Sequence, residues 1–585
     1  MKNDPVVDDR RRPAGQTFLS VLVALAGFAV AARAGDPPVL RIAYFIPRDR
    51  QPCADYTNRL DAVVRDVQEL YRTGMEANGH GPLCFTPDRT ADGRLRFFVV
   101  RGKQPMREYG RNDAGKVRQE VKEAFSQAGL DLERETVLLF QVLLEWQGGK
   151  AVEVGPYCGS GDQRHGTAWV YDDERLDPRR LADLSPGGYY HGPCSIGKFN
   201  THYVGGVAHE LGHALGLPHD REARNDPRGS SLMGGGNHTY GRDRRNEGKG
   251  TFLSAASALP LVRHPLFTGR AEAGGAACSS TLLDLSAEFQ GGALSVAGRL
   301  QAQPAAYGVA AFNDSEQIPD DYDALGLASG VDSKGRFRFA ITELSQGRWA
   351  LRLRVCHANG GSSWLAFDYA VDSQNRPDLS AFRARWQLNE AVQARARGDL
   401  SAAEALVSKL EKSASLSPQL QREAAHLRSL FSPAPPKRLA DLPASARTVS
   451  VAELAFAEAR TGWGAPLRNE VAPEQGKSCL IEIEGQFFSR GLYAHAPALH
   501  RLDLAGGWSR LRSRAGLQDG HKGSVVFVVK GDGRELYRSP RVEARKVVSL
   551  EVDVRGVATL ELATENAGDG NNGDWAVWAA PELAR

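Results

Sequence analysis

The chain has 585 residues and a mass of 63.4 kDa, so several domains are expected, because single hydrophobic cores stop growing near about 250–300 residues. Hydrophobic residues make up 42% and charged residues 24%, a composition that excludes a largely disordered chain. The net charge of +3, from 73 basic and 70 acidic side chains, is too balanced for a dedicated nucleic-acid binder, so no nucleic-acid partner is expected.

The N-terminus has the pattern of an export signal. Three arginines at residues 10–12 precede a mostly apolar run at residues 18–32, and Ala32-Arg33-Ala34 forms a small-x-small cleavage site. We therefore predict a signal peptide at residues 1–34 and a protein that is secreted, periplasmic or bound at the cell surface. An uncleaved anchor is the alternative. No later stretch approaches about 20 apolar residues, so no other membrane contact is expected.

Residues 35–268 alternate between strand and helix patterns, which predicts an α/β domain. Strands are expected where β-branched and aromatic residues cluster, and helices where apolar residues recur every three or four positions. The expected strands are residues 39–45, 95–100, 137–144 and 167–171, and the expected helices are residues 55–75, 114–128 and 201–215.

The pattern changes in the rest of the chain. Residues 269–376 have short alternating segments separated by Gly, Asn and Asp, which predicts a small β-sandwich. Residues 377–432 are rich in Ala, Leu and Arg at helical spacing, which predicts a short α-helical hairpin or bundle. A Pro-rich linker is expected at residues 433–444, and residues 445–585 alternate again as a second β-rich domain.

Seven cysteines suit an oxidising compartment, and one set of pairings joins nearest neighbours within each domain. Six cysteines allow fifteen connectivities, so this set is one of many. The chain has no CxxC pair, which argues against a thiolate zinc site. The nearest-neighbour disulfides would be Cys53–Cys84, Cys158–Cys194 and Cys278–Cys356, with Cys479 unpaired.

Residues 209–220 (HELGHALGLPHD) carry the clearest chemistry. His209 and His213 are four residues apart, so both project from one face of a helix and can bind one Zn²⁺. Gly216 can take a positive φ and end the helix, and the chain can then return His219 as a third ligand. Three protein ligands leave one position for water, which is typical of a catalytic zinc.

Glu210 lies beside the first histidine and can act on a water at the metal. It would take the proton of that water as general base and return it to the leaving amine. The predicted reaction is zinc-dependent hydrolysis of a peptide bond.

These residues resemble the metzincin metallopeptidases, whose pattern is HExxHxxGxxH followed by a methionine turn. The resemblance implies that Met233 lies beneath the metal and that an antiparallel edge strand binds an extended polypeptide substrate. Two preceding helices and Asp220 after the third histidine look most like the adamalysin-type branch, which implies a role for Asp220 beside the ligands. The substrate strand is expected to comprise Thr167, Ala168, Trp169 and Val170.

The C-terminal region resembles the NPCBM domain, a family named for carbohydrate binding. The resemblance rests on residues 488–497 (FSRGLYAHAP), 523–527 (GSVVF), 531–533 (GDG) and 574–576 (DWA). It implies a β-jelly-roll that binds glycans or glycoproteins. Asp574, Trp575 and Trp578 are the candidate sugar contacts, and the alternative is that both tryptophans fill the core.

Together these features predict a secreted zinc endopeptidase of metzincin type with one catalytic zinc, tethered to glycans or glycoproteins by its C-terminal module. The first alternative is a non-catalytic carbohydrate- or surface-binding protein on a peptidase scaffold. Another is a zinc hydrolase that deamidates or releases single residues. The expected architecture is a metzincin-like α/β domain, a β-sandwich, a short helical segment and a β-jelly-roll.

Overall fold

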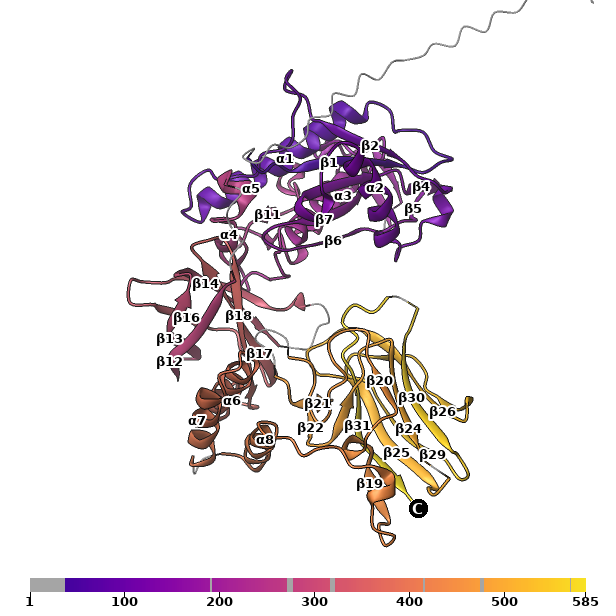
Figure 1. The fold of residues 1–585 in the computed structure, drawn as a ribbon. Helices are drawn as coiled ribbons and strands as arrows, with labels where there is room; N and C mark the ends of the chain where they lie inside the picture. The colour runs from indigo at the N-terminus through magenta and orange to yellow at the C-terminus, as the bar shows by residue number, and fades with distance from the viewer. Residues whose placement is uncertain are drawn as a thin grey trace, which may run out of the picture.

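The computed structural model describes residues 37–189, 192–270, 277–315, 321–413, 416–473, 478–504, 506–568 and 570–585. The export signal predicted for residues 1–34 lies outside them. The described chain is a multidomain, mixed α/β protein built largely of strands (Figure 1). Within these ranges, no helix combines the length and the apolar character that a membrane span requires.

A five-stranded sheet in the order β2-β1-β3-β7-β6 forms the centre of the N-terminal domain. Neighbouring strands from β2 to β7 are parallel, whereas β6 runs antiparallel to β7 at the edge. Every residue of β3 and β7 is buried, as expected for strands in the middle of a covered sheet. The strands are β1 (Arg41–Ile46), β2 (Phe97–Arg101), β3 (Thr136–Gln141), β6 (Cys158–Gly161) and β7 (Gly166–Tyr171).

Three long helices accompany this sheet, close to the positions that the sequence predicts: α1 (Tyr56–Ala77), α2 (Ala114–Gln127) and α3 (Ile196–Ala214). Helix α3 packs on β6 and β7, and the hydroxyl of Tyr71 on α1 donates to the carbonyl of Ala208 on α3 at 2.9 Å. Helix α3 begins earlier than expected because Ser195 caps it, accepting the backbone N–H of Lys198.

Shorter elements complete the domain. The strand expected at residues 137–144 is divided, since β3 ends at Gln141 and Leu144 begins a strand of a second sheet. That sheet contains β4 (Leu144–Gln147), β5 (Lys150–Glu153), β8 (Pro186–Tyr189) and β9 (Pro193–Ser195). A parallel pair, β10 (Ser230–Ser231) and β11 (Thr251–Phe252), precedes α4 (Ala255–Leu261) and α5 (Pro265–Thr268).

The next unit is a β-sandwich, as its alternating segments predict. Side chains of both sheets meet in one core that includes Val296 on β13 and Leu353 on β17. One sheet contains β12 (Ser279–Gln290), β13 (Ala293–Gln303) and β16 (Arg336–Ile341). The other contains β15 (Leu325–Gly330), β14 (Ala306–Asp314), β17 (Gly347–His357) and β18 (Ser362–Val371).

Three capped helices follow the β-sandwich: α6 (Leu379–Ala396), α7 (Leu400–Glu411) and α8 (Pro418–Ser429). Phe382 on α6 joins the β-sandwich core, while other side chains of these helices pack against Cys479 and Leu480 of the C-terminal module. The helices therefore connect the two units, as Figure 1 shows.

The segment at residues 433–444 is not a free linker. Lys437 exchanges backbone hydrogen bonds with Glu453 and Ala455, and Leu439 and Leu442 pack on the module core. The apolar side chains among the prolines bind this segment to the module.

The C-terminal module consists of two facing sheets. Phe527 on β26 and Trp578 on β31 come from different sheets and meet edge to face at 5.0 Å in the shared core. One sheet contains β19 (Thr448–Ser450), β31 (Ala576–Ala584), β25 (Arg510–Leu517), β29 (Val547–Asp553) and β23 (Gly491–Tyr493). The other contains β20 (Glu458–Arg460), β24 (Ala498–Asp503), β30 (Thr559–Asn566), β26 (Ser524–Gly531), β27 (Arg534–Arg538) and β28 (Val542–Glu543), and β21 (Ile481–Ile483) pairs with β22 (Gln486–Phe488).

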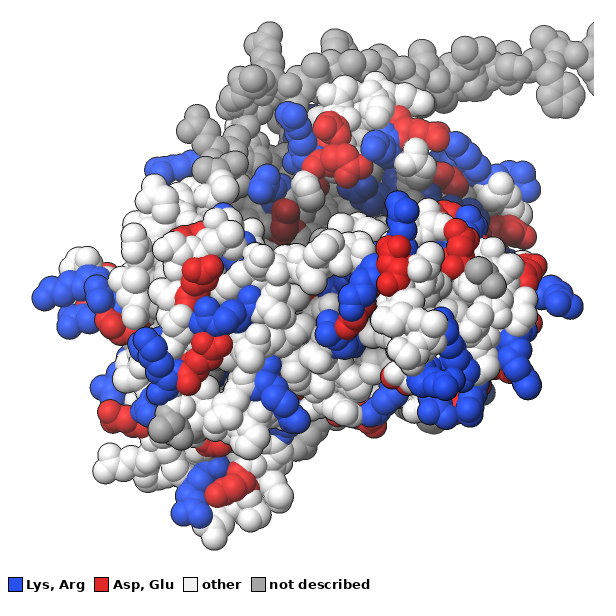
Figure 2. Space-filling model, turned by 60° about the horizontal axis from the view of Figure 1, so that its bottom comes forward, with Lys and Arg blue, Asp and Glu red and all other residues white. Residues whose placement is uncertain are grey.

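The predicted disulfides are not formed, because all seven cysteines are free thiols. The thiol of Cys84 donates to the carbonyl of Gln68 at 3.1 Å, and that of Cys278 donates to the amide oxygen of Asn359 at 3.4 Å. Burial raises the pKa of Cys84 to about 12, which keeps this thiol protonated and unreactive. Basic and acidic side chains are interspersed on the face shown in Figure 2.

Candidate metal centre and active site

Three histidines converge beside helix α3. Nε2 of His213 lies 3.2 Å from Nε2 of His209 and 3.0 Å from Nε2 of His219. Among the described residues these three form a cluster whose ligand atoms all lie within 4.8 Å of one another. The three predicted metal ligands are thus brought together.

The hydrogen bonds of two of the rings fix their tautomers. Nδ1 of His209 lies 2.7 Å from the carbonyl of Leu232, and Nδ1 of His213 lies 2.9 Å from the carbonyl of Leu217. A carbonyl only accepts, so both Nδ1 atoms carry the proton and both Nε2 atoms present lone pairs. Burial lowers the pKa of His209 to about 4 and that of His213 to about 3, so these rings are neutral.

These facing lone pairs match zinc geometry. Tetrahedral zinc with bonds of about 2.0–2.1 Å places its nitrogen ligands roughly 3.3 Å apart, close to the 3.2 Å and 3.0 Å that separate Nε2 of His213 from those of His209 and His219. Imidazoles held by backbone carbonyls through Nδ1 are also typical of metal ligands. The donor set therefore fits one Zn²⁺ with three protein ligands.

The end of helix α3 explains how His219 reaches the other two histidines. Gly216 has φ 75°, and its N–H donates to the carbonyl of His213 at 2.9 Å. The N–H of Leu217 donates to the carbonyl of Gly212 at 2.9 Å. These two bonds form a Schellman motif, which needs a left-handed residue at Gly216 and reverses the chain toward the helix face.

Glu210 lies on α3 next to His209 and faces strand β6. Desolvation raises its pKa to about 8, and the backbone N–H of Gly159 opposes this shift by donating to the carboxylate. The fit between β6 and α3 is close, because a Cβ atom on Gly159 would lie 2.0 Å from the carbonyl oxygen of Glu210.

The substrate strand predicted from Thr167, Ala168, Trp169 and Val170 is wrong. These residues belong to β7, which is hydrogen-bonded to β3 on one side and β6 on the other. The edge of the sheet is instead β6 (Cys158–Gly161), which is antiparallel and lies against α3. Its outer edge is the one that can pair with an extended peptide.

Met233 and Asp220 lie next to each other after helix α3, and the N–H of Asp220 donates to the carbonyl of Met233 at 3.3 Å. Met233 is fully buried, and its Sδ is the atom that a Cβ on Gly212 of α3 would meet first, at 2.3 Å. The buried carboxylate of Asp220 accepts hydrogen bonds from the hydroxyls of Ser231, Ser254 and Ser257. Asp220 therefore ties the chain after His219 to the segment before Met233 and to α4.

Other polar side chains near the motif have structural partners. The hydroxyl of Tyr240 donates to Asp66 at 2.6 Å, and Tyr240 is buried. The rings of His202 and His238 stack on each other at 5.2 Å.

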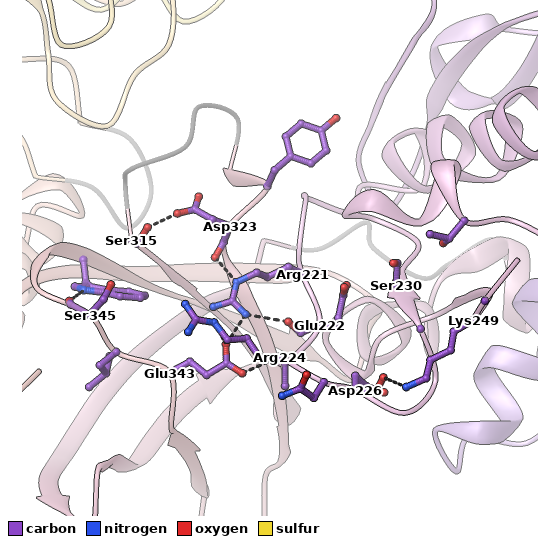
Figure 3. A pocket seen from close by; sticks show the side chains of 18 of the residues that line it. Arg221, Glu222, Arg224, Asp226, Ser230, Lys249, Ser315, Asp323, Glu343 and Ser345 are labelled. Atoms are coloured by element: carbon purple, nitrogen blue, oxygen red, sulfur yellow. Dashed lines mark hydrogen bonds and ion pairs between the residues drawn. The ribbon is translucent and has the colours of Figure 1, made fainter. Parts of the chain in front are cut away.

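The β-sandwich also contributes to the site, which sequence reasoning missed. The ring of Tyr322 stacks on His219 with the centroids 3.8 Å apart. Tyr322 is 43% exposed and lines a cavity of about 790 Å³ between the N-terminal domain and the β-sandwich. Figure 3 shows Arg221 reaching from the N-terminal domain toward Glu343 of the β-sandwich, with which it forms an ion pair at 2.7 Å. Tyr322 lies more than 100 positions after His219, so no local sequence pattern connects it to the histidines.

The sugar contacts predicted in the C-terminal module are only partly accessible. Trp578 is fully buried and its indole N–H donates to Thr564 at 3.2 Å, so the prediction that it contacts sugar is wrong. Asp574 is buried and accepts the N–H of Ser524 at 2.8 Å. Trp575 is half-buried and stands beside Trp463, at 4.7 Å, whose side chain is 45% exposed.

A comparison with protein families identifies the last unit. Residues 447–584 match the family described as the NPCBM/NEW2 domain. The C-terminal module is an NPCBM domain. A protein of Renibacterium salmoninarum described as "Putative endo-alpha-N-acetylgalactosaminidase" is 29% identical over 123 residues. That match covers 20% of this chain and only 8% of the relative's length.

Solved structures similar to this chain include wild-type OgpA from Akkermansia muciniphila. It is 24% identical with a TM-score of 0.49, covering 59% of this chain and 97% of OgpA. A second OgpA structure, of a catalytically inactive form in complex with an O-glycopeptide substrate, has the same identity and TM-score. A CBM51 domain of Clostridium perfringens GH95, in complex with methyl-galactose, is 20% identical with a TM-score of 0.21 and covers 23% of this chain and 99% of that domain.

Proposed function

We propose that this protein is an exported zinc endopeptidase of metzincin type whose NPCBM domain binds glycans on its glycoprotein substrates. The observation that carries the proposal is the convergence of the Nε2 atoms of His209, His213 and His219 beside Glu210. Three histidines leave one coordination position open, which favours a catalytic over a structural metal.

The residues of the chain have distinct tasks in this proposal. Zinc, when bound, supplies Lewis-acid polarisation of the substrate carbonyl and lowers the pKa of water. Glu210 takes a proton from the attacking water and returns it to the leaving amine. The N–H of Gly159 holds the Glu210 carboxylate, and the outer edge of β6 pairs with the substrate backbone.

A polypeptide substrate has room beside Tyr322. The cavity of about 790 Å³ is lined by Tyr322, which stacks on His219, and by charged side chains of both domains. It can hold a large polar side chain of the substrate on the side of Tyr322 that faces away from the histidines, since neither the three histidines nor Glu210 lines it.

The NPCBM domain would concentrate the enzyme on glycosylated targets. Trp463, which is 45% exposed, offers an aromatic surface on which a sugar ring can stack, and the half-buried Trp575 lies beside it. Lys522 of this domain forms an ion pair at 2.8 Å with Asp321, directly before Tyr322, so the module is joined to the region of the metal centre. The carbohydrate-related name of the Renibacterium relative supports a glycan ligand, and binding two parts of one substrate raises the effective concentration.

The test is cleavage of a mucin-type glycoprotein and of its deglycosylated form by the purified protein, with and without a zinc chelator. Glu210→Gln is the matched control, because it keeps the size of the side chain and all three histidines. We expect chelator-sensitive cleavage that falls at least about 100-fold in Glu210→Gln while one zinc per chain remains. Cleavage that persists in Glu210→Gln, or zinc-loaded protein that cuts neither substrate, would contradict the proposal.

A further inference from the structure

We infer that the β-sandwich is part of the metal centre, with Arg354 and Tyr322 as positioning residues for the loop that carries His219. This loop, residues 216–221, is called the ligand loop here. The inference rests on the metal site of the proposed function. It assigns a role to a domain that otherwise looks like a spacer.

Arg354 on β17 holds the start of the ligand loop. It is fully buried, and its Nη1 donates to the carbonyl of Gly216 at 2.8 Å. Its Nε and Nη2 find no hydrogen-bond partner among the described residues. Burying a guanidinium is costly, and the hydrogen bond to Gly216 offsets part of this cost. This bond therefore fixes the carbonyl of Gly216 against the β-sandwich. A cation at the C-terminal end of α3 also complements the helix dipole.

Tyr322 holds the ligand itself. Its ring lies 3.8 Å from the ring of His219, centroid to centroid, with an angle of 26° between the planes. It is also nearly parallel to His209, at 7° and 6.4 Å. Stacking restricts the rotation of the His219 ring, and with it the direction of its Nε2 lone pair.

The backbone of the ligand loop is paired to the β-sandwich at its other end. The N–H of Arg221 donates to the carbonyl of Ala324 at 2.8 Å, and the N–H of Gly326 donates to the carbonyl of Arg221 at 3.1 Å. The guanidinium of Arg221 adds the ion pair with Glu343 and a bond to the carbonyl of Asp323 at 2.9 Å (Figure 3). The ligand loop is therefore held by the β-sandwich at Gly216, His219 and Arg221.

The same loop also orients a second ligand. The carbonyl of Leu217 accepts the Nδ1–H of His213 at 2.9 Å, which fixes the tautomer of that ring. Outer partners of metal-bound histidines typically change metal affinity about 10- to 100-fold. Two of the three ligands thus depend on contacts that the β-sandwich makes.

The test measures metal binding by the full chain. Tyr322→Ala removes the stacked ring at a partly exposed position, Tyr322→Phe keeps it, and Leu283→Ala is the control at a similarly exposed site on β12 of the same domain. Zinc affinity is measured by competition with a chelator, and ligand geometry by the visible absorption of the Co²⁺-substituted protein. Tyr322→Ala is expected to weaken zinc binding about 3- to 10-fold and to alter the Co²⁺ spectrum. Tyr322→Phe and Leu283→Ala are expected to match the wild type.

Arg354→Met is expected to weaken zinc binding about 10- to 100-fold. If Arg354→Met does not fold, the comparison of Tyr322→Ala with Tyr322→Phe decides alone. Folded Tyr322→Ala protein with wild-type zinc affinity and an unchanged Co²⁺ spectrum would overturn the inference while the proposed function stands. A wild-type chain that takes up no zinc would instead overturn the proposed function, and this inference with it.

Discussion

Replacing Asp220 tests whether the segments around the three histidines are held together by one buried carboxylate. Asp220 is fully buried and accepts hydrogen bonds from Ser231, Ser254 and Ser257, the last at 2.7 Å. A hydrogen bond to a charged group contributes about 1.5–3 kcal/mol. Three such bonds at the lower value give about 4.5 kcal/mol, and the burial that raises the pKa of the Asp220 carboxyl offsets part of this gain.

Asp220→Ala is therefore expected to destabilise the N-terminal domain by about 3–5 kcal/mol. Asp220→Asn should cost less, because its amide group can donate to serine hydroxyls that turn to accept. The measurement is urea unfolding, followed together with zinc retention, since the domains of this chain need not unfold in one step.

Asp92→Ala is the matched control, because its carboxylate is 61% exposed and should change stability by less than about 0.5 kcal/mol. An Asp220→Ala protein that unfolds at the same urea concentration as the Asp92→Ala control would refute this reasoning. So would an Asp220→Asn protein that is less stable than Asp220→Ala.

Four further substitutions have defined outcomes. Burial raises the pKa of Glu390 to about 7, so its contribution to stability is full below its ordinary value of 4.5 and is lost as the pH rises through 7. Glu390→Gln should remove this pH dependence, which is worth about 3 kcal/mol. The free energy of unfolding of both proteins is measured between pH 4.5 and 8, and an equal change with pH in the two proteins would contradict the prediction. Trp463→Ala should weaken glycan binding about tenfold with no loss of stability, whereas Trp578→Ala should destabilise the NPCBM domain by about 3–5 kcal/mol. Glycan titration and thermal unfolding measure the two effects. A Trp463→Ala protein that loses stability but binds glycan normally would contradict the prediction. Gly159→Ala should displace β6 from α3, because its Cβ would lie 2.0 Å from the carbonyl of Glu210, and reduce cleavage at least tenfold; unchanged cleavage kinetics would show that β6 is not part of the cleft.

The convergence of the three histidines could be predicted from sequence because their geometry is local. His209 and His213 share a helical face, and Gly216 supplies the left-handed turn that brings back His219 within a few residues. In helix α3 the start was misplaced, because the cap at Ser195 lies before the apolar pattern becomes regular.

The edge strand could not be found by strand propensity. Residues 167–171 are β-branched and aromatic because β7 is buried in the middle of the sheet. The true edge strand carries Gly159 and Gly161, which have low strand propensity. Those glycines are needed because α3 approaches so closely that a Cβ at either would meet its backbone within 2.2 Å.

Contacts between domains were likewise invisible in the sequence. Tyr322 and Arg354 belong to the β-sandwich and follow no pattern that links them to the histidine motif. The sequence alone does not distinguish whether Trp575 or Trp578 is buried. The packing of Phe527 against Trp578 shows that Trp578 is the one in the core.

The most direct test of the central claim is zinc K-edge X-ray absorption of the purified, metal-loaded protein. One zinc per chain is expected, bound by three imidazole nitrogens and one exchangeable oxygen at about 2.0–2.1 Å. A site with a fourth protein ligand, or a folded protein that binds no zinc at these three histidines, would contradict the claim.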